Sequence, residues 1–331
     1  MRSRFIKTGR REALTALGAL GAASLLAPAS LRAQTFPSGP IRLVHGYNAG
    51  SGPDILARQL APLMVERLGA QIVVEARPGA GERLVASQVA RAPADGQTLY
   101  MITGGQTVVA ATDASLQYDV RKDFSYIGMV SQYPFAFMVS ADSPLRTLAD
   151  LLEAARRNPG KVSYSSVGIG TTLHMAVELL SSMTGVSMHH IPYKGTAAYN
   201  DLIGGSLDMS VGTLAGAQGL LRDGRMRALC VTSPQRWPGW EEIPSAAETV
   251  PGYDVVTWAA LCAPGGLPEA IRSRVAEALR QSLDDAELRA KVAATGSVVY
   301  ANTPDQMRER VERDVEKWQK VAAFANIRLD R

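Results

Sequence analysis

The sequence predicts an α/β protein built from mainly parallel sheets with helices on both faces. The first observation is the order of its segments, because short apolar runs typical of buried strands alternate with helical stripes along most of the chain. The second is length, since 331 residues correspond to about two domains. The third is composition: 46% hydrophobic and 20% charged residues are typical of a globular protein.

The first half of the chain shows the alternation clearly. A strand is expected at 41–44, followed by a Gly-rich turn and by a helix over 54–68 that ends at Gly69. Further buried strands are expected in the apolar runs 72–75, 99–102 and 135–139.

The second half begins with a helix from Thr147, where Asp150 completes a near capping box. A strand at 162–165, a helix over 171–184 and strands at 188–192, 207–211 and 228–231 are expected next. The run 255–263 is long enough for a strand that crosses between two lobes. After it only helices are expected, over 268–282, 286–294 and 303–325.

The N-terminus predicts an export signal. Residues 1–11 carry five cations and no acid, and a weakly apolar run of mostly Ala, Leu and Gly follows over 13–29. That run is short for a bilayer span but fits the apolar region of a signal peptide. The pair Arg10-Arg11 resembles a twin-arginine signal, which exports folded proteins. We expect cleavage after Ala33 or Ala29 and a periplasmic mature protein.

The net charge of +4 belongs to this export signal. Residues 1–33 hold six of the 35 Lys and Arg residues and one of the 31 acids, so their removal leaves a net charge of −1. Aromatic residues make up only 6%, too few to suggest a base-stacking surface. No later run is long and apolar enough to span a bilayer. We therefore expect no nucleic-acid partner and no membrane span.

The two cysteines, Cys230 and Cys262, both lie in apolar, strand-like surroundings. A periplasmic location permits a disulfide, but the sequence does not place the two side chains together. Two buried free thiols are the expected state.

Motifs that would support catalysis or metal binding are missing from the sequence. There is no Gly-x-Ser-x-Gly, His-Glu-x-x-His, Gly-x-x-x-x-Gly-Lys or Cys-x-x-Cys. Gly79-Ala80-Gly81 and Gly168-Ile169-Gly170 each begin a dinucleotide fingerprint without completing it. His189 and His190 alternate along an expected strand and so point to opposite faces. We expect no enzyme activity, no metal site and no cofactor.

Turns rich in Gly, Ser and Thr lead from strands into helices at 47–54, 168–172 and 193–196. In parallel sheets such turns lie at the carboxyl ends of strands, where ligands bind. Each offers free backbone N–H groups and a positive helix end, which suit an anion. The alternative is that Gly and Ser only form tight turns and Thr only caps a helix. Three such turns, with Lys194 in one of them, favour an anion site.

Several stretches, in their order and spacing, resemble a known family. They include Glu75-Ala76-Arg77-Pro78-Gly79-Ala80-Gly81, Ala94-Asp95-Gly96-Gln97-Thr98-Leu99, Gly170-Thr171-Thr172-Leu173-His174 and His190-Ile191-Pro192-Tyr193-Lys194-Gly195. With Arg227-Ala228-Leu229-Cys230-Val231-Thr232-Ser233, they resemble the Bug family of extracytoplasmic solute receptors, the binding components of tripartite tricarboxylate transporters. The resemblance covers essentially the whole mature chain.

The resemblance implies a two-lobed periplasmic binding protein fold of type II, each lobe a mainly parallel sheet flanked by helices. Residues 34–139 and 259–331 would form the first lobe and residues 140–258 the second, with a small carboxylate in the cleft between them. The implied ligand-binding residues are Tyr47, Asn48, Ala49, Gly50, Ser51, Gly105, Gly168, Gly170, Thr171, Thr172, His174, Lys194, Gly195 and Thr213. Asp54 is expected to cap its own helix and fix the first turn, because an acid would repel a carboxylate.

Some positions depart from the family's common pattern. Gly46, Asn48 and Pro53 stand where Pro, Pro and Thr are frequent, and Glu82, Arg83 and Val85 replace a usual Gly-Asn-x-Gly run. Gly212 replaces a common Asp, which removes a side chain that would meet an amino group of the ligand. We therefore expect a dicarboxylate or an aromatic carboxylate rather than an amino acid.

The sequence thus predicts a non-catalytic, monomeric receptor that delivers a small carboxylate to integral membrane transporter subunits. A periplasmic sensor for a two-component kinase would need the same cleft, so the sequence does not separate these two functions. An exported hydrolase is the remaining alternative, and the missing nucleophile motif weighs against it.

Overall fold

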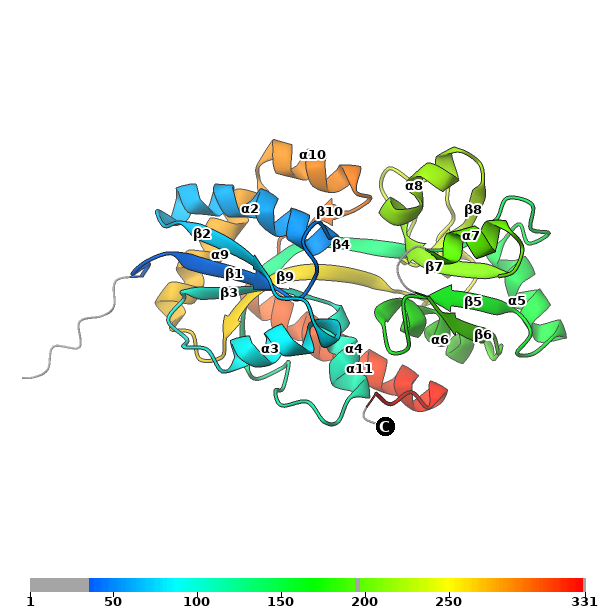
Figure 1. Ribbon diagram of the computed structural model, residues 1–331, viewed down its shortest axis with the longest axis horizontal. Coiled ribbons are helices and arrows are strands. Elements are labelled where there is room, and N and C mark those ends of the chain that lie inside the picture. The colour runs from blue at the N-terminus through cyan, green and yellow to red at the C-terminus, as the bar shows by residue number, and fades with distance from the viewer. Residues whose placement is uncertain (1–35, 194–196, 330–331) are drawn as a thin grey trace, which may run out of the picture. The chain divides into compact units, whose positions relative to one another are not determined.

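The computed structural model describes residues 36–193 and 197–329. The predictions made for residues 1–33, Lys194 and Gly195 therefore lie outside the described residues. The described chain is an α/β structure in which one mixed sheet is flanked by helices (Figure 1).

The first half of the chain contains β1 (Ile41–His45), α2 (Gly52–Leu68), β2 (Ile72–Ala76), α3 (Arg83–Ala90), β3 (Thr98–Thr103), α4 (Gly105–Thr112) and β4 (Phe124–Ser140). The strands predicted at 41–44, 72–75 and 99–102 are confirmed, and α2 ends at Gly69 as expected. The sequence did not indicate α3 and α4, because each has only eight residues and too few turns to show a period.

The second half contains α5 (Leu148–Arg157), β5 (Ser163–Ser166), α6 (Thr172–Thr184), β6 (His189–Pro192), α7 (Ala198–Ile203), β7 (Met209–Thr213), α8 (Leu214–Arg222) and β8 (Met226–Val231). Then follow β9 (Val256–Pro264), α9 (Glu269–Leu283), α10 (Ala286–Ala294), β10 (Val298–Val299) and α11 (Pro304–Ala325). The predicted capping box at Thr147 is present, and a second capping box, at Thr303, begins α11.

The prediction that only helices follow β9 is wrong in one detail. Val298 and Val299 form the short strand β10, which pairs antiparallel with Gln132 and Ser131 of β4. Two β-branched residues suit a sheet position, but a run of two is too short to be read as a strand from sequence.

The strand order is β2-β1-β3-β9-β4-β7-β5-β6, and β8 and β10 also pair with β4. Strands β1, β2 and β3 are parallel to one another, and so are β5, β6 and β7. Strands β4 and β9 run antiparallel to their neighbours. The two parallel groups are therefore joined by antiparallel strands, and Figure 1 shows β4 and β9 side by side between them.

Strand β4 is 17 residues long and changes partners in its middle. It pairs with β9 as far as Pro134, and from Phe135 onward it pairs with β7 and β8. The chain returns from the second group immediately before β9, where the Val255 N–H donates to the Thr232 carbonyl at 2.8 Å. The chain thus passes from the first group of strands to the second between residues 134 and 135, and it returns between residues 255 and 256. The lobe boundaries expected from the sequence, after residues 139 and 258, stay predictions.

The first parallel group is buried on both faces. Leu43, Leu99 and Met101 pack with apolar residues of α2 and α9 on one face. Tyr100 and Ile102 pack with α3 and the first half of α11 on the other. This alternation along β3 is expected for a strand with helices on both sides.

Helix α11 packs against both groups of strands. Met307, Val311 and Val315, in its first half, share a core with Trp258 of β9. Trp318 and Val321, in its second half, belong to the core around β5 and α6. The periodic apolar stripe of one helix therefore ties the two groups together. Both cysteines are buried and unpaired, which confirms the expectation of free thiols.

Candidate functional site

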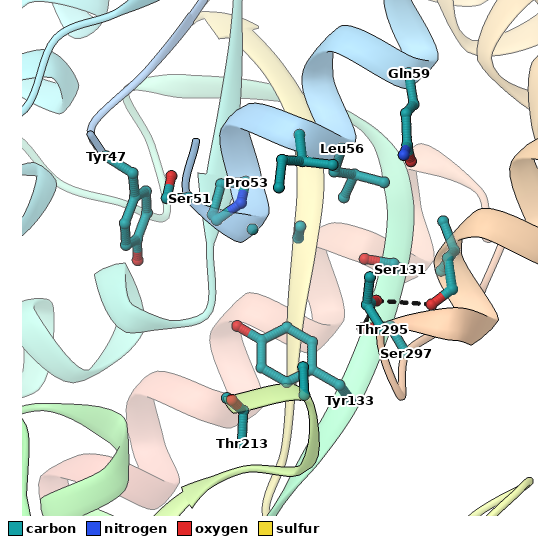
Figure 2. A pocket seen from close by; sticks show the side chains of 15 residues that line it. Tyr47, Ser51, Pro53, Leu56, Gln59, Ser131, Tyr133, Thr213, Thr295 and Ser297 are labelled. Atoms are coloured by element: carbon teal, nitrogen blue, oxygen red, sulfur yellow. Dashed lines mark hydrogen bonds between the residues drawn. The ribbon is translucent and has the colours of Figure 1, made fainter. Parts of the chain in front are cut away.

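A pocket of about 370 Å³ lies at the start of α2 (Figure 2). It is lined by Tyr47, Ser51, Gly52, Pro53, Ile55, Leu56, Gln59, Ser131, Tyr133, Thr213, Ala215, Ala259, Val292, Thr295 and Ser297. None of these lining side chains carries a charge. Tyr47 and Ser51 come from the turn between β1 and α2, Tyr133 from β4 and Thr213 from the end of β7.

The pocket contains part of the predicted site. Tyr47, Ser51 and Thr213 line it, and Asn48, Ala49 and Gly50 lie exposed in the same turn as Tyr47. Thr213 caps α8, because its hydroxyl accepts from the Gly216 N–H at 3.1 Å. Gly105 lies beside the pocket, since its backbone N–H donates to Thr103, a hydrogen-bond partner of Tyr47.

The turn before α2 is held in place by Asp54. This side chain is buried, and its carboxylate accepts from the Gly50 N–H, from Arg58 Nε and from His45 Nε2, each at 2.9 Å. The Arg58 guanidinium and the Gly50 N–H lower the pKa of Asp54 to about 2. Asp54 therefore fixes the turn as expected, but it does not cap its own helix: the N-cap residue is Ser51, and the N–H that Asp54 accepts from is that of Gly50, before the helix.

The amino end of α2 keeps groups that suit an anion. Ser51 is the N-cap residue, but its side chain makes no capping hydrogen bond, and its buried hydroxyl has no partner among the described residues. The helix N–H groups of Gly52 and Asp54 likewise have no acceptor within the described chain. Free N–H groups at the positive end of a helix favour a carboxylate.

Tyr47 belongs to a chain of hydrogen-bonded side chains. Its hydroxyl lies 2.9 Å from Thr103 Oγ1, and Thr103 Oγ1 lies 2.7 Å from Glu82 Oε2. Glu82 is only 2% exposed, and burial raises its pKa to about 8. A neutral carboxylic acid is thus connected to the pocket through two hydroxyl groups.

Glu82 occupies an unusual backbone position. It has φ of 68°, in the left-handed region that favours glycine, and it precedes the first residue of α3. A Cβ on Gly46 would lie 2.7–2.8 Å from Glu82 atoms, including its Cα. The departures from the family pattern at positions 46 and 82 are therefore linked, because glycine at 46 makes room for the residue at 82.

The turn at 168–172 does not line this pocket. The Gly170 N–H donates to His174 Nδ1 at 3.2 Å, and the Thr171 hydroxyl donates to the Gly168 carbonyl at 2.7 Å. A Cβ on Gly170 would lie 2.8 Å from the side chain of Leu329, near the C-terminus. A role in ligand binding stays a prediction for Gly168, Gly170, Thr171, Thr172 and His174.

His174 belongs to a packed aromatic cluster. Its ring stacks on His190 with ring centroids 4.1 Å apart, and Ser166 Oγ lies 2.7 Å from His190 Nε2. Burial lowers the pKa of His174 to about 3 and that of His190 to about 4. Both rings are therefore neutral near pH 7, and His174 serves as the acceptor that holds Gly170.

Gly212 is explained by its neighbour Tyr199. A Cβ on Gly212 would overlap the Tyr199 hydroxyl and would lie 3.1 Å from the Met138 methyl group. An Asp side chain at this position would therefore require Tyr199 to move. The expectation that the ligand is not an amino acid stays a prediction.

Other kinds of site are not found in the described part of the chain. No cluster of three or more His, Cys, Asp or Glu residues there is arranged to hold a metal ion. Among the same residues, no helix combines the length and the apolar character needed to cross a membrane.

A family model described as the tripartite tricarboxylate transporter family receptor matches residues 56–327. The chain belongs to this family. Its relatives include a UPF0065 protein from the tcbD-tcbE intergenic region of Pseudomonas sp. strain P51, 33% identical over 95% of this chain and 94% of the relative. Protein BugT of Bordetella pertussis is 28% identical over 94% of this chain and 96% of its own length.

Solved structures of similar proteins place the receptor in a fold class. An R. palustris protein solved with adipate is 31% identical, with a TM-score of 0.77 over 88% of this chain and 99% of its own. MatC from Rhodopseudomonas palustris with bound malate is 26% identical, with a TM-score of 0.74 over 86% and 99%. The predicted α/β, two-lobed periplasmic binding protein fold is confirmed, and receptors of this family are periplasmic binding proteins rather than enzymes.

Several pocket residues of the receptor were not found by sequence reasoning. Ser131 and Tyr133 lie within β4, and Thr295 and Ser297 flank the end of α10, far from Tyr47 along the chain. No local motif marks them, because they reach the pocket only through the pairing of β4 with β10. The linked departures at Gly46 and Glu82 were the available signal for the buried acid.

Proposed function

We propose that this receptor captures a small organic carboxylate at the start of α2 and delivers it to the membrane subunits of a tripartite transporter. The observation that carries the proposal is the amino end of α2, where a free Ser51 hydroxyl and unpaired N–H groups adjoin a pocket. A carboxylate placed there would accept charge-assisted hydrogen bonds in surroundings that exclude water. The single acid of this turn, Asp54, is bound to Arg58 and Gly50 and so does not oppose the ligand.

The rest of the ligand is best matched by an uncharged body. Pro53, Leu56, Ala215 and Val292 contribute apolar surface, and among the residues that the structure describes no lysine, arginine or histidine lines the pocket. A second carboxylate would lose much of its hydration without gaining an opposite charge. Of the two expected classes, an aromatic carboxylate therefore fits the lining better than a dicarboxylate, although solved relatives carry adipate and malate.

We further propose that the mature receptor is an exported periplasmic monomer. Support comes from the cation-rich start of the sequence and its short apolar run over 13–29, which have the pattern of a signal peptide. Removal of residues 1–33 would leave a chain of almost balanced charge, suited to a freely diffusing receptor.

Isothermal titration with benzoate, adipate, malate and glutamate tests the function directly. We expect benzoate to bind most tightly and glutamate to bind weakest. Ser51→Ala should weaken benzoate binding about tenfold, because one hydrogen bond to a charged oxygen is lost. Ser273→Ala, an exposed serine on α9, serves as the matched control and should leave the affinity unchanged. Absence of binding by all four compounds would contradict the proposed function.

A further inference from the structure

We propose that Glu82 is a positioning residue of this pocket: as a neutral acid it donates to Thr103, Thr103 donates to Tyr47, and the Tyr47 hydroxyl donates to the bound anion. This inference rests on the proposed function, because it assigns a donor to the carboxylate captured beside α2. Under this proposal, the Tyr47 hydroxyl donates to the bound anion only while Glu82 is protonated.

The distances support one continuous chain. Glu82 Oε2 and Thr103 Oγ1 are 2.7 Å apart, and Thr103 Oγ1 and the Tyr47 hydroxyl are 2.9 Å apart. Tyr47 lines the pocket, and Figure 2 shows its ring extending from the turn before α2. A Cβ on Gly105 would lie 3.9 Å from the Tyr47 hydroxyl, which places the start of α4 beside the same chain of hydroxyl groups.

The direction of the chain follows from the number of protons. Each hydroxyl has one hydrogen to donate, so a proton on Glu82 Oε2 sends the Thr103 hydrogen toward Tyr47 and the Tyr47 hydrogen toward the pocket. Glu82 Oε1 is buried without a hydrogen-bond partner, and an acid proton placed there would remain unsatisfied. The proton is therefore better placed on Oε2. Ionised Glu82 would reverse the chain and turn a Tyr47 lone pair toward the anion.

Burial favours the neutral form of Glu82 and outweighs the hydrogen bonds from Thr103, Gln106, Tyr100 and Tyr47, which lower its pKa. The titratable groups around it are the tyrosines at 47, 100, 118 and 133 and the thiol of Cys262, and burial raises the pKa of every one of them. No salt bridge to Glu82 occurs among the described residues, because the adjacent Arg83 lies 3.2 Å from Asp113. Desolvation therefore acts on Glu82 without an opposing cation, and its pKa rises to about 8.

The backbone adds an independent argument that this acid has a function. A buried glutamate in a left-handed conformation carries both backbone strain and the cost of desolvation. Glycine, which this φ favours, would avoid both costs. Backbone strain at a buried acid points to an action on a neighbour, and Thr103, 2.7 Å away, is the neighbour that leads to Tyr47.

The ligand-free protein tests the relay without any probe. In protein labelled with ¹³C at glutamate and tyrosine, the Glu82 carboxyl carbon and the Tyr47 Cζ should titrate together near pH 8. Glu82→Gln identifies the first signal and should remove the titration of the second. A Glu82 carboxyl that ionises below pH 6, or a Tyr47 signal that does not follow it, would overturn the proposal.

Binding supplies the second test, with benzoate and adipate as probes. Their carboxylates are ionised throughout pH 6.5–9.5, so only the protein titrates in that range. The affinity of the wild-type receptor should fall up to tenfold per pH unit above pH 8, because only the neutral form of Glu82 leaves Tyr47 as a donor. Glu82→Gln, whose amide also donates to Thr103, and Tyr47→Phe should both give flat profiles.

Glu178→Gln provides a matched control. Glu178 is also a partly buried acid with a raised pKa and a tyrosine partner, Tyr164 at 2.6 Å, but it does not line the pocket. This variant should keep the wild-type pH profile. A fall in affinity that persists in Glu82→Gln would overturn the relay, whereas absence of binding at every pH would contradict the proposed function and leave the decision on the relay to the ligand-free titration.

Discussion

At the scale of single residues, Asp54 shows how one carboxylate prepares a site that it does not enter. It accepts from the turn, from the strand before it and from its own helix, through Gly50, His45 and Arg58. Because these groups neutralise the acid, the amino end of α2 remains attractive to an anion. The same acid left unpaired would repel a bound carboxylate.

Asp54→Asn should lower the free energy of unfolding by about 2 kcal/mol at pH 7. The pKa of Asp54 is about 2 in the folded protein and lies near its ordinary value of 3.8 when unfolded. The stabilisation is therefore complete above about pH 5 and is mostly lost by about pH 2. Urea denaturation from pH 7 to pH 2 measures it, and the difference between wild type and variant should shrink in that window.

Asp142→Asn is the control for this experiment, because Asp142 is exposed and has no salt bridge among the described residues. It should change stability by less than about 0.5 kcal/mol. An Asp54→Asn protein as stable as wild type at pH 7 would contradict the anchoring role of Asp54.

At the scale of elements, β4 and α11 connect the two groups of strands. β4 does so by pairing, since its first half faces β9 and its second half faces β7 and β8. α11 does so by packing, because its apolar stripe continues from one hydrophobic cluster into another. Together, β4 and α11 hold Tyr133, which forms one wall of the pocket, in position relative to α2.

Trp318→Ala, in the second half of α11, should lower the free energy of unfolding by about 3–5 kcal/mol. Trp318 is 3% exposed, and its removal would leave a cavity in the cluster that contains Phe137 and Tyr253. Phe324→Ala is the matched control, since Phe324 lies on the same helix but is 52% exposed. Its cost should stay below about 1 kcal/mol in urea denaturation. Equal losses in the two variants would contradict the bridging role of α11.

At the scale of the whole molecule, the pocket assembles distant parts of the chain around a space whose described lining is uncharged. The start of α2, the middle of β4, the end of β7 and the segment after α10 each contribute a wall. The ligand preference therefore depends on the sum of these walls and not on one motif. Because no cation lines the pocket within residues 36–193 and 197–329, added positive charge should change that preference.

Ile55→Lys adds a cation at the rim of the pocket, at a side chain that is 42% exposed and so tolerates the change. Adipate and malate should gain about tenfold in affinity relative to benzoate, because their second carboxylate acquires a partner. Leu84→Lys, at an apolar residue that is 50% exposed and outside the pocket, should leave the ratio unchanged. Isothermal titration of both variants measures the affinity for each dicarboxylate relative to benzoate. If this ratio is unchanged in Ile55→Lys, the pocket is not the binding site.

The sequence by itself determined the features that local spacing encodes. Apolar periods located the long helices and most strands, although they missed the first half of β4, residues 124–134. The near capping box at Thr147 also marked a helix start correctly. The first turn was also predictable, since Gly, Ser and Asp at 50, 51 and 54 stand at fixed distances from the start of α2. Each of these depends on residues a few positions apart, whose relative placement the backbone dictates.

The tertiary structure decided which distant residues share the pocket and which acid is neutral. Tyr133 and Ser297 approach Tyr47 through strand pairing, and Glu82 reaches Thr103 across 21 positions of sequence. It also placed the turn at 168–172 in a network of its own, with its hydroxyl and N–H groups bound to His174 and Gly168. The physical reason is that desolvation and hydrogen bonding depend on neighbours in space, and only the packed chain brings those neighbours together.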